Sequence, residues 1–210
     1  MFVLIPQTDT PGAHIAAARL RGQGDTVATC YGDPNGEWCA AVSGGRCPLD
    51  DGVDMVVVVR PEISAERLPR EEAALCGAAR GIPVVIAGAS GGHPYGAIAT
   101  ADDETSDVTA VVGTVAALPL VWHSTVATGA LRTSLIASGV DPAGAWVDVH
   151  RRNSGLVVHL NLLAPGDRRS LGVAAVRVLA AMRDVDPWAK TIDVVRVVAA
   201  DGIGAARAVA

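Results

Sequence analysis

Residues 1–30, MFVLIPQTDTPGAHIAAARLRGQGDTVATC, decide the fold expected for this chain. They open with a short apolar run that ends at Pro6, as expected of a buried β-strand. Residues 8–11, TDTP, combine three helix-capping residue types with a proline, which is typical of the start of a helix. Residues 26–31 are again β-branched and apolar and predict a second strand. The stretch therefore predicts a strand, a loop, a helix and a second strand in succession.

The alternation of strand and helix continues beyond this stretch. Apolar runs at 55–59 and 83–87 are typical of strands covered on both faces. Residues 64–79 are predicted to form a helix, whose regular part starts near Pro69. Residues 108–118 fit either a helix or an apolar strand. Alternating strands and helices indicate a parallel sheet with helices on both faces. We therefore expect a three-layer α/β domain over residues 1–140.

A smaller second module is expected after this domain. Gly139 and Pro142 interrupt the pattern, so we place a boundary there and the module at residues 143–200. Its pattern predicts two strands joined by a hairpin turn at 152–155, then a helix and a closing strand, a small α+β unit of ββαβ order. The glycine- and alanine-rich tail, residues 201–210, is expected to fray.

The composition argues against several classes of function. The chain has 210 residues, half of them apolar, and a formal net charge of −5. Basic residues cluster only in pairs, and because phosphate contacts need clustered positive charge, we expect no nucleic-acid partner. No window of about twenty residues is apolar without interruption, and no signal peptide is recognised. We therefore expect no membrane span and a cytoplasmic protein.

The four cysteines are Cys30, Cys39, Cys47 and Cys76. They form no CxxC pair, and no histidine stands at zinc-finger spacing from a cysteine pair. We interpret them as reduced structural thiols and predict no metal site. The alternative is a redox pair of Cys39 and Cys47, or an adventitious metal site, because both lie in one glycine-rich segment.

The first candidate binding site is the loop that opens the first helix, with Thr8, Asp9, Thr10 and Gly12. Backbone N–H groups at a helix N-terminus attract anions, and the side chains of this loop offer hydrogen bonds. The GxGxxG and GxxxxGK[ST] patterns are both absent, and Asp9 opposes a phosphate placed directly over the cap. Ordinary helix capping is the alternative interpretation.

The second candidate site is the glycine-rich loop at residues 88–96, GASGGHPYG. Its candidate ligand-binding residues are Ser90, Gly91, Gly92 and His93. In a parallel sheet this loop leaves the same carboxyl edge as the first loop. His93 and Asp9 are the candidate catalytic residues, whereas an ordinary surface loop is the alternative.

The predicted hairpin distributes its residues over two faces. A register that pairs Arg151 with Leu156 puts Asp148 opposite His159. One face then carries Trp146, Asp148, His150, His159 and Asn161. The opposed aspartate and histidine are either a pH-sensitive contact or acid/base pair, or part of a solvated face or an interface. Because an exposed Trp146 is costly, we predict an interface through Trp146, Asp148, His150 and His159, with the first domain or another subunit.

Parts of the chain resemble known families in layout. The order of elements before residue 140 resembles flavodoxins and response-regulator receivers, and residues 17–27, AARLRGQGDTV, resemble the first helix of many Rossmann-like domains, including sugar-nucleotide glycosyltransferases. A receiver implies a phosphoacceptor aspartate after the third strand, where this chain has residues 60–62, RPE. Residues 145–198 resemble small α+β modules of the alkaline-shock protein type and of cation-efflux transporter tails, which implies a role in association.

These features predict a protein that binds a small anionic or nucleotide-like ligand at the two loops and has a regulatory or scaffold role. The second module is expected to associate with a second copy or with a protein partner. Two alternatives stay open: a transferase or hydrolase acting on a small metabolite at the same loops, and a purely structural interaction protein. No cofactor is identified.

Overall fold

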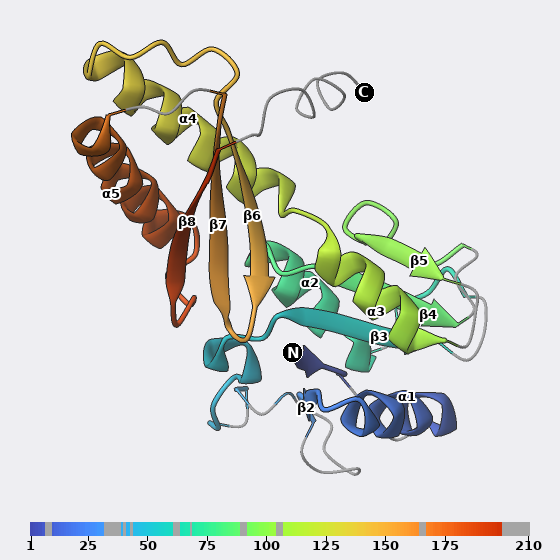
Figure 1. Ribbon diagram of the computed structural model, residues 1–210. Coiled ribbons are helices and arrows are strands. Elements are labelled where there is room, and N and C mark those ends of the chain that lie inside the picture. The colour runs from blue at the N-terminus through green and yellow to red at the C-terminus, as the bar shows by residue number, and fades with distance from the viewer. Residues whose placement is uncertain are drawn as a thin grey trace. The chain divides into compact units, whose positions relative to one another are not determined.

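The computed structural model describes two compact units (Figure 1). The first comprises Met1–Leu118 and Arg152–Ser154, and the second comprises Pro119–Arg151 and Gly155–Ala210. The residues described are 1–6, 10–31, 39, 41–42, 44–60, 64–67, 69–88, 92–103, 107–163 and 167–198.

The first unit is built on a parallel five-stranded sheet. Its strands are β1 (Phe2–Leu4), β2 (Thr26–Ala28), β3 (Met55–Arg60), β4 (Val84–Gly88) and β5 (Ala101–Asp103). Their order across the sheet is β2-β1-β3-β4-β5, and every neighbouring pair is parallel. The structure therefore confirms the α/β class expected from the alternating pattern.

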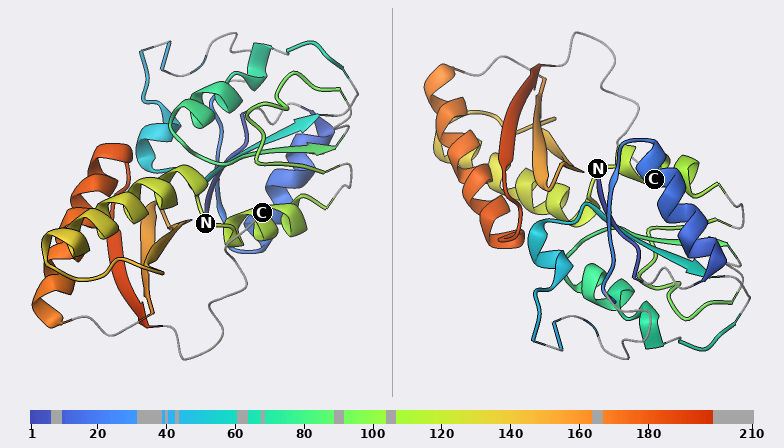
Figure 2. Two further views of the ribbon diagram at one scale, coloured as in Figure 1. Left: turned by 90° about the horizontal axis from the view of Figure 1, so that it is seen from above. Right: turned by 90° about the horizontal axis from the view of Figure 1, so that it is seen from below.

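Helices cover both faces of this sheet (Figure 1 and Figure 2). They are α1 (Pro11–Gly22), α2 (Ala73–Ala79) and α3 (Val108–Ala117). On β3, Met55 and Val57 pack with α1 and α3, whereas Val56 and Val58 pack with α2. Because side chains alternate between the faces of a strand, a strand buried on both faces must be apolar throughout, which explains the valine run of β3. Residues 108–118, left open between helix and strand, contain the helix α3.

The helix predicted at residues 64–79 is much shorter in the structure. Two short 3₁₀ turns, η1 (Pro48–Asp51) and η2 (Pro69–Glu71), occur in this unit, and α2 begins only at Ala73. The reason lies partly in Arg60, whose guanidinium donates 2.7 Å hydrogen bonds to the backbone carbonyls of Ser64 and Glu66. The Arg60 side chain thus holds the backbone of residues 64–66, which is not helical.

The second unit is a three-stranded sheet with two helices on one face (Figure 1). Its elements are α4 (Val121–Ala137), β6 (Trp146–Arg152), β7 (Gly155–Leu162), α5 (Arg168–Val185) and β8 (Ile192–Val198). The strand order is β6-β7-β8, and β7 and β8 are parallel. Asn153 and Ser154 join β6 to β7 with φ of 51° and 64°, as in a type I′ hairpin turn.

The ββαβ order expected for the second module is present, with one additional helix in front of it. Helix α4 belongs to the second unit, whereas Gly139 and Pro142 led us to expect the boundary after this helix. The buried side chains of α4, such as Leu131 and Leu135, pack into the same core as α5 and the three strands. The glycine and proline therefore mark the α4–β6 loop within a unit rather than the end of a unit.

Residues Val108–Ala137, taken as one helical segment, are long and apolar enough to cross a membrane, with a mean hydropathy of 1.5. In the structure this segment is two helices, α3 and α4, separated by Leu118–Leu120. Of the apolar window, 28% is buried inside the protein. Helix α3 buries Val108, Val111, Val112 and Val115 against the first sheet. This spacing is that of a helix with one face packed on a sheet.

Candidate functional site

The carboxyl edge of the first sheet has the topology of a ligand site. The chain passes from β1 outward to β2 and then returns to β3 on the other side of β1. In open α/β sheets, ligands bind outside the carboxyl ends of the strands at the point where the order reverses in this way. Here that point lies between β1 and β3, and helix α1 begins beside it.

The start of α1 is a well-formed helix cap. The Thr10 hydroxyl oxygen accepts a hydrogen bond from the Ala13 backbone N–H at 3.2 Å, and Pro11 occupies the first helical position. A Cβ added to Gly12 would lie 3.3 Å from Cγ1 of Val59, so glycine lets α1 pack closely on β3. Two other predicted ligand residues of this loop, Thr8 and Asp9, lie outside the described residues.

The second loop leaves the same edge of the sheet, as expected. Because all five strands are parallel, β1 and β4 end on one side, with β3 between them. Neighbouring strands lie about 4.8 Å apart, so the two loops leave the sheet roughly 10 Å apart, a span that suits a small molecule. In this loop Ser90 and Gly91 lie outside the described residues, and Gly92 is exposed with a φ of 77°.

His93, the candidate catalytic residue of the second loop, is held by two contacts. Its Nδ1 accepts a hydrogen bond from the Tyr95 backbone N–H at 3.0 Å, and its Nε2 lies 3.0 Å from Oδ1 of Asp102 in β5. The side chain is only 3% exposed. Both ring nitrogens are thus engaged, and the arrangement favours a role in fixing the loop to β5 over a role in proton transfer.

A buried ion pair at the end of β3 lies between the two loops and was not predicted. Arg60 and Glu71 are 1% and 0% exposed, and Arg60 Nε lies 3.0 Å from Glu71 Oε1. The Tyr95 hydroxyl donates to Glu71 Oε2 at 3.0 Å. Burial, followed by the charge of Glu71, raises the pKa of Tyr95 far above its ordinary value and keeps the hydroxyl protonated. An arginine directly after a run of valines was the available signal in the sequence.

This ion pair fixes residues at the edge of the sheet, but it leaves no unpaired charge for a ligand. The Arg60 guanidinium is matched by the Glu71 carboxylate and by two backbone carbonyls, so its charge is neutralised within the protein. A Cβ on Gly88, which has a φ of 96°, would collide with the Arg60 carbonyl oxygen. The glycine therefore allows β4 to end directly against β3. Any ligand at this edge is expected to be held by loops and by the start of α1, not by Arg60.

The open face of the second sheet carries the predicted interface residues. The Asp148 carboxylate accepts hydrogen bonds from Trp146 Nε1 at 3.2 Å and from Asn161 Nδ2 at 3.1 Å. The His150 and His159 rings meet edge to face, with centroids 5.7 Å apart. His159 thus lies against His150, and Asp148 bonds Trp146 and Asn161 on this face.

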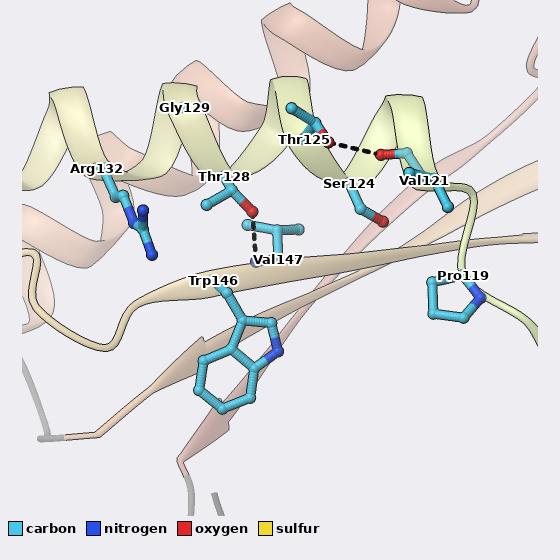
Figure 3. Close-up of a pocket in the computed structure, with 9 residues that line it drawn as sticks. All are labelled: Pro119, Val121, Ser124, Thr125, Thr128, Gly129, Arg132, Trp146 and Val147. Carbon is cyan, nitrogen blue, oxygen red and sulfur yellow. Dashed lines mark hydrogen bonds between the residues drawn. The ribbon is translucent and has the colours of Figure 1, made fainter. Parts of the chain in front are cut away.

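At the β6 edge of the second sheet, side chains of α4 form a ladder of hydrogen bonds with the backbone of β6 (Figure 3). Side chains one helical turn apart satisfy the backbone of β6: the Ser124 hydroxyl accepts from Val149 N at 2.9 Å, and the Thr128 hydroxyl accepts from Val147 N at 2.9 Å. One turn further on, Arg132 Nε donates to the Ala145 carbonyl at 2.8 Å. The ladder protects an edge strand that would otherwise expose unpaired backbone groups.

A shallow groove of about 500 Å³ follows this ladder. Figure 3 shows the residues that line it: Pro119, Val121, Ser124, Thr125, Thr128, Gly129, Arg132, Trp146 and Val147. The polar side chains at its floor are those already bonded to β6, so the groove is mainly an apolar surface. The signal for this arrangement was the four-residue spacing of polar residues in an apolar helix, which was not recognised in the sequence.

The second unit also contains a buried charged cluster. Asp186, at the end of α5, forms an ion pair with Arg151 of β6, and its Oδ2 lies 3.6 Å from Nε2 of His123 in α4. The Ala189 backbone N–H donates to Asp186 Oδ1 at 3.1 Å. Burial raises the pKa of Asp186, but His123 and Arg151 together lower it by more, so the carboxyl group stays ionised well below neutral pH.

A comparison of the chain with protein-family models, curated proteins and solved structures finds no match. The class of protein is defined by the fold: an α/β protein with a parallel five-stranded sheet in a Rossmann- or flavodoxin-like layout, joined to a small mixed sheet with helices. Among the residues that the structure describes, no group of three or more His, Cys, Asp or Glu side chains is placed to hold a metal ion.

Proposed function

We propose that the first unit binds a small anionic ligand of nucleotide-like chemistry and that the protein has a regulatory or scaffold role. The observation that carries this proposal is the strand order β2-β1-β3-β4-β5, which puts a reversal point between β1 and β3. Helix α1 begins at this point, and its dipole favours negative charge there. The start of α1, with Thr10 and Gly12, and the loop with Gly92 and His93 are the two walls of the proposed site.

Thermal unfolding of the full chain with nucleotides, dinucleotides and sugar phosphates tests this proposal. A ligand at 100 times its Kd adds about 2.7 kcal/mol of stability, which raises the melting temperature by several degrees. A panel in which no compound shifts the melting temperature contradicts the proposal.

Two substitutions at Thr10 locate the site. Aspartate and serine both cap helices well, so neither T10D nor T10S should unfold α1. T10D adds a negative charge where the anion is expected and should abolish the ligand-induced shift, whereas T10S should retain it. An unchanged shift in T10D places the ligand elsewhere.

We further propose that the second unit associates with a second copy or a protein partner through the open face of its sheet. The face carries the half-buried Trp146 and His159, and Val195 of β8, in register with His159, is 42% exposed. Partly exposed apolar and aromatic side chains gathered on one sheet face are typical of an interface.

Light scattering coupled to size exclusion tests the association. V195D places a charge on the open face and should convert an oligomer into a monomer. V176D is the matched control, because Val176 is 67% exposed on α5, away from that face. A monomeric unmodified protein, or equal effects of the two substitutions, contradicts self-association through this face.

A further inference from the structure

The groove along α4 and β6 has a mainly apolar lining with one charged side chain (Figure 3). Of its nine lining residues, only Arg132 is charged. The hydroxyl groups in the lining already have partners. Those of Ser124 and Thr128 accept from the backbone of β6, and that of Thr125 donates to the Val121 carbonyl at 2.9 Å. A ligand in the groove would therefore meet apolar surface, bonded hydroxyls and one positive charge.

Arg132 presents this charge in a fixed place. Its Nε donates to the Ala145 carbonyl at 2.8 Å, which holds the guanidinium beside the start of β6. This bond uses one of the five N–H donors of the guanidinium. Among the described residues, no carboxylate pairs with Arg132 and no acceptor takes the other four donors. A guanidinium whose outer donors are free can bind a carboxylate through two parallel hydrogen bonds.

The groove is long, and Arg132 lies at one end of it. Figure 3 shows Arg132 at one end and Val121 and Pro119 at the other, with Gly129 between them. Val121 and Arg132 are eleven residues apart on α4, so the groove follows the helix for about 16 Å, roughly the length of an extended chain of twelve carbons. A Cβ added to Gly129 would meet nothing within 4 Å, so the middle of the groove is open.

We propose that this groove binds a free medium-chain fatty acid. The carboxylate pairs with the Arg132 guanidinium, and the aliphatic chain lies along α4, past Gly129 and Trp146, to Val121 and Pro119. A chain in this place covers Val121, which is 80% exposed, and the half-buried Trp146. Removing such apolar surface from water stabilises the complex, while the single charge sets the direction of the chain.

The charge and the shape of the groove favour this ligand over two others. A phosphate monoester carries nearly two negative charges at neutral pH, and the lining offers only the one cation, Arg132. A membrane surface is flat, whereas a concave groove admits a single chain. The proposal depends neither on ligand binding by the first unit nor on association through the open face of the second sheet.

A titration of the ¹⁵N-labelled full chain with decanoate, kept below its micelle concentration, tests the proposal by NMR. The indole N–H of Trp146 reports on the groove, and that of Trp188, which does not line it, is the internal control. W146F and W188F identify the two resonances. Decanoate should shift the Trp146 resonance in a saturable way and leave that of Trp188 in place. Butyrate, which is too short to follow α4, should bind much more weakly.

Substitutions at Arg132 test the contact with the carboxylate. R132Q should weaken decanoate binding by about threefold, a modest factor because Arg132 is exposed, and should leave the affinity for 1-decanol unchanged. R132K keeps the charge and should lose less than R132Q. R177Q is the matched control, because Arg177 is exposed on α5 and does not line the groove, and it should change neither affinity.

A substitution at Gly129 tests the path of the chain. Leucine favours a helix more than glycine does, so G129L should keep α4 folded while its side chain fills the middle of the groove. It should weaken decanoate and 1-decanol alike, by about tenfold or more, because it displaces the aliphatic chain. G172L, at a helical glycine of α5 that also has open space around it, is the matched control and should bind both ligands normally.

Four results overturn the proposal. The first is the absence of saturable binding of decanoate, and the second is a shift of Trp188 in place of Trp146. The third is an equal effect of R132Q on decanoate and 1-decanol, which removes the contact with the carboxylate. The fourth is binding to phosphatidylcholine vesicles without binding of free decanoate, which makes the apolar surface a membrane contact.

Discussion

Asp186 is expected to be the most sensitive single position in the second unit. Asp186 is 1% exposed and is the counter-charge of Arg151, whose side chain is 3% exposed. Asp186→Asn keeps the size of the side chain but leaves the guanidinium buried without a matching charge. Breaking a buried ion pair from one side costs about 3–5 kcal/mol, a large part of the roughly 5–15 kcal/mol that stabilises a typical domain.

Urea unfolding, followed by tryptophan fluorescence, measures this cost. Three of the four tryptophans, Trp122, Trp146 and Trp188, lie in the second unit, so the signal reports mainly on it. Asp184→Asn is the matched control, because Asp184 is exposed on the same helix. D184N should change the free energy of unfolding by less than about 0.5 kcal/mol.

The pH dependence follows from the direction of the Asp186 pKa shift. The folded-state pKa lies below the ordinary value of 3.8, because His123 and Arg151 outweigh the effect of burial. A lowered pKa contributes stability that is present above the unfolded-state pKa and is lost as the pH falls through the folded-state pKa. The difference between the unmodified protein and D186N should therefore be full at neutral pH and shrink below about pH 4.

The reasoning is refuted if D186N costs less than about 1 kcal/mol at neutral pH, or no more than D184N. A double variant separates two contributions to the free energy of unfolding: the lost attraction of the pair, and the cost of leaving one charge buried without a partner. Replacing both partners by apolar residues, as in R151M with D186L, removes the uncompensated charge and should destabilise the unit less than D186N alone.

Three further substitutions test other contacts. T128V removes the hydroxyl that accepts from the backbone of β6 and should cost about 1–3 kcal/mol in urea unfolding, whereas T125V, on the exposed side of α4, should be nearly neutral. G88A forces a side chain into a φ of 96° against the carbonyl of β3 and should cost at least about 1–2 kcal/mol, while G96A, with open space and no positive φ, should cost less. Because the pKa of Tyr95 is raised above 10.0, its contribution is present below pH 10 and lost above it; Y95F should remove that alkaline loss.

The sequence by itself determined the local elements. The apolar runs of β1, β3 and β4 and the TDTP start of α1 predicted strands and a helix start that the structure contains. The hairpin pattern likewise predicted one face that carries Trp146, and the structure puts the intervening Val147 and Val149 in the core. These features follow from neighbours within one or two turns, because the period of a strand or helix is fixed by backbone geometry.

The sequence left other elements undecided. Residues 108–118 fitted both a helix and a strand, since a short apolar run satisfies either period once it is buried on most sides. Gly139 and Pro142 indicated the loop that follows α4, but they did not indicate the unit to which α4 belongs. The unit to which a helix belongs depends on the core against which it packs. For α4, that core includes strands that come later in the chain.

Only the tertiary structure brought the chemistry-bearing residues together. Arg60 and Glu71, His93 and Asp102, and the members of the Asp186 cluster are separated along the chain, and their pairing depends on strand order and on which helix covers which face. The same holds for Cys30, Cys39 and Cys47, which pack in one cluster although their spacing contains no recognised motif. Contacts of this kind are set by the packing of whole elements, which balances burial and charge across the unit, and no local pattern encodes them.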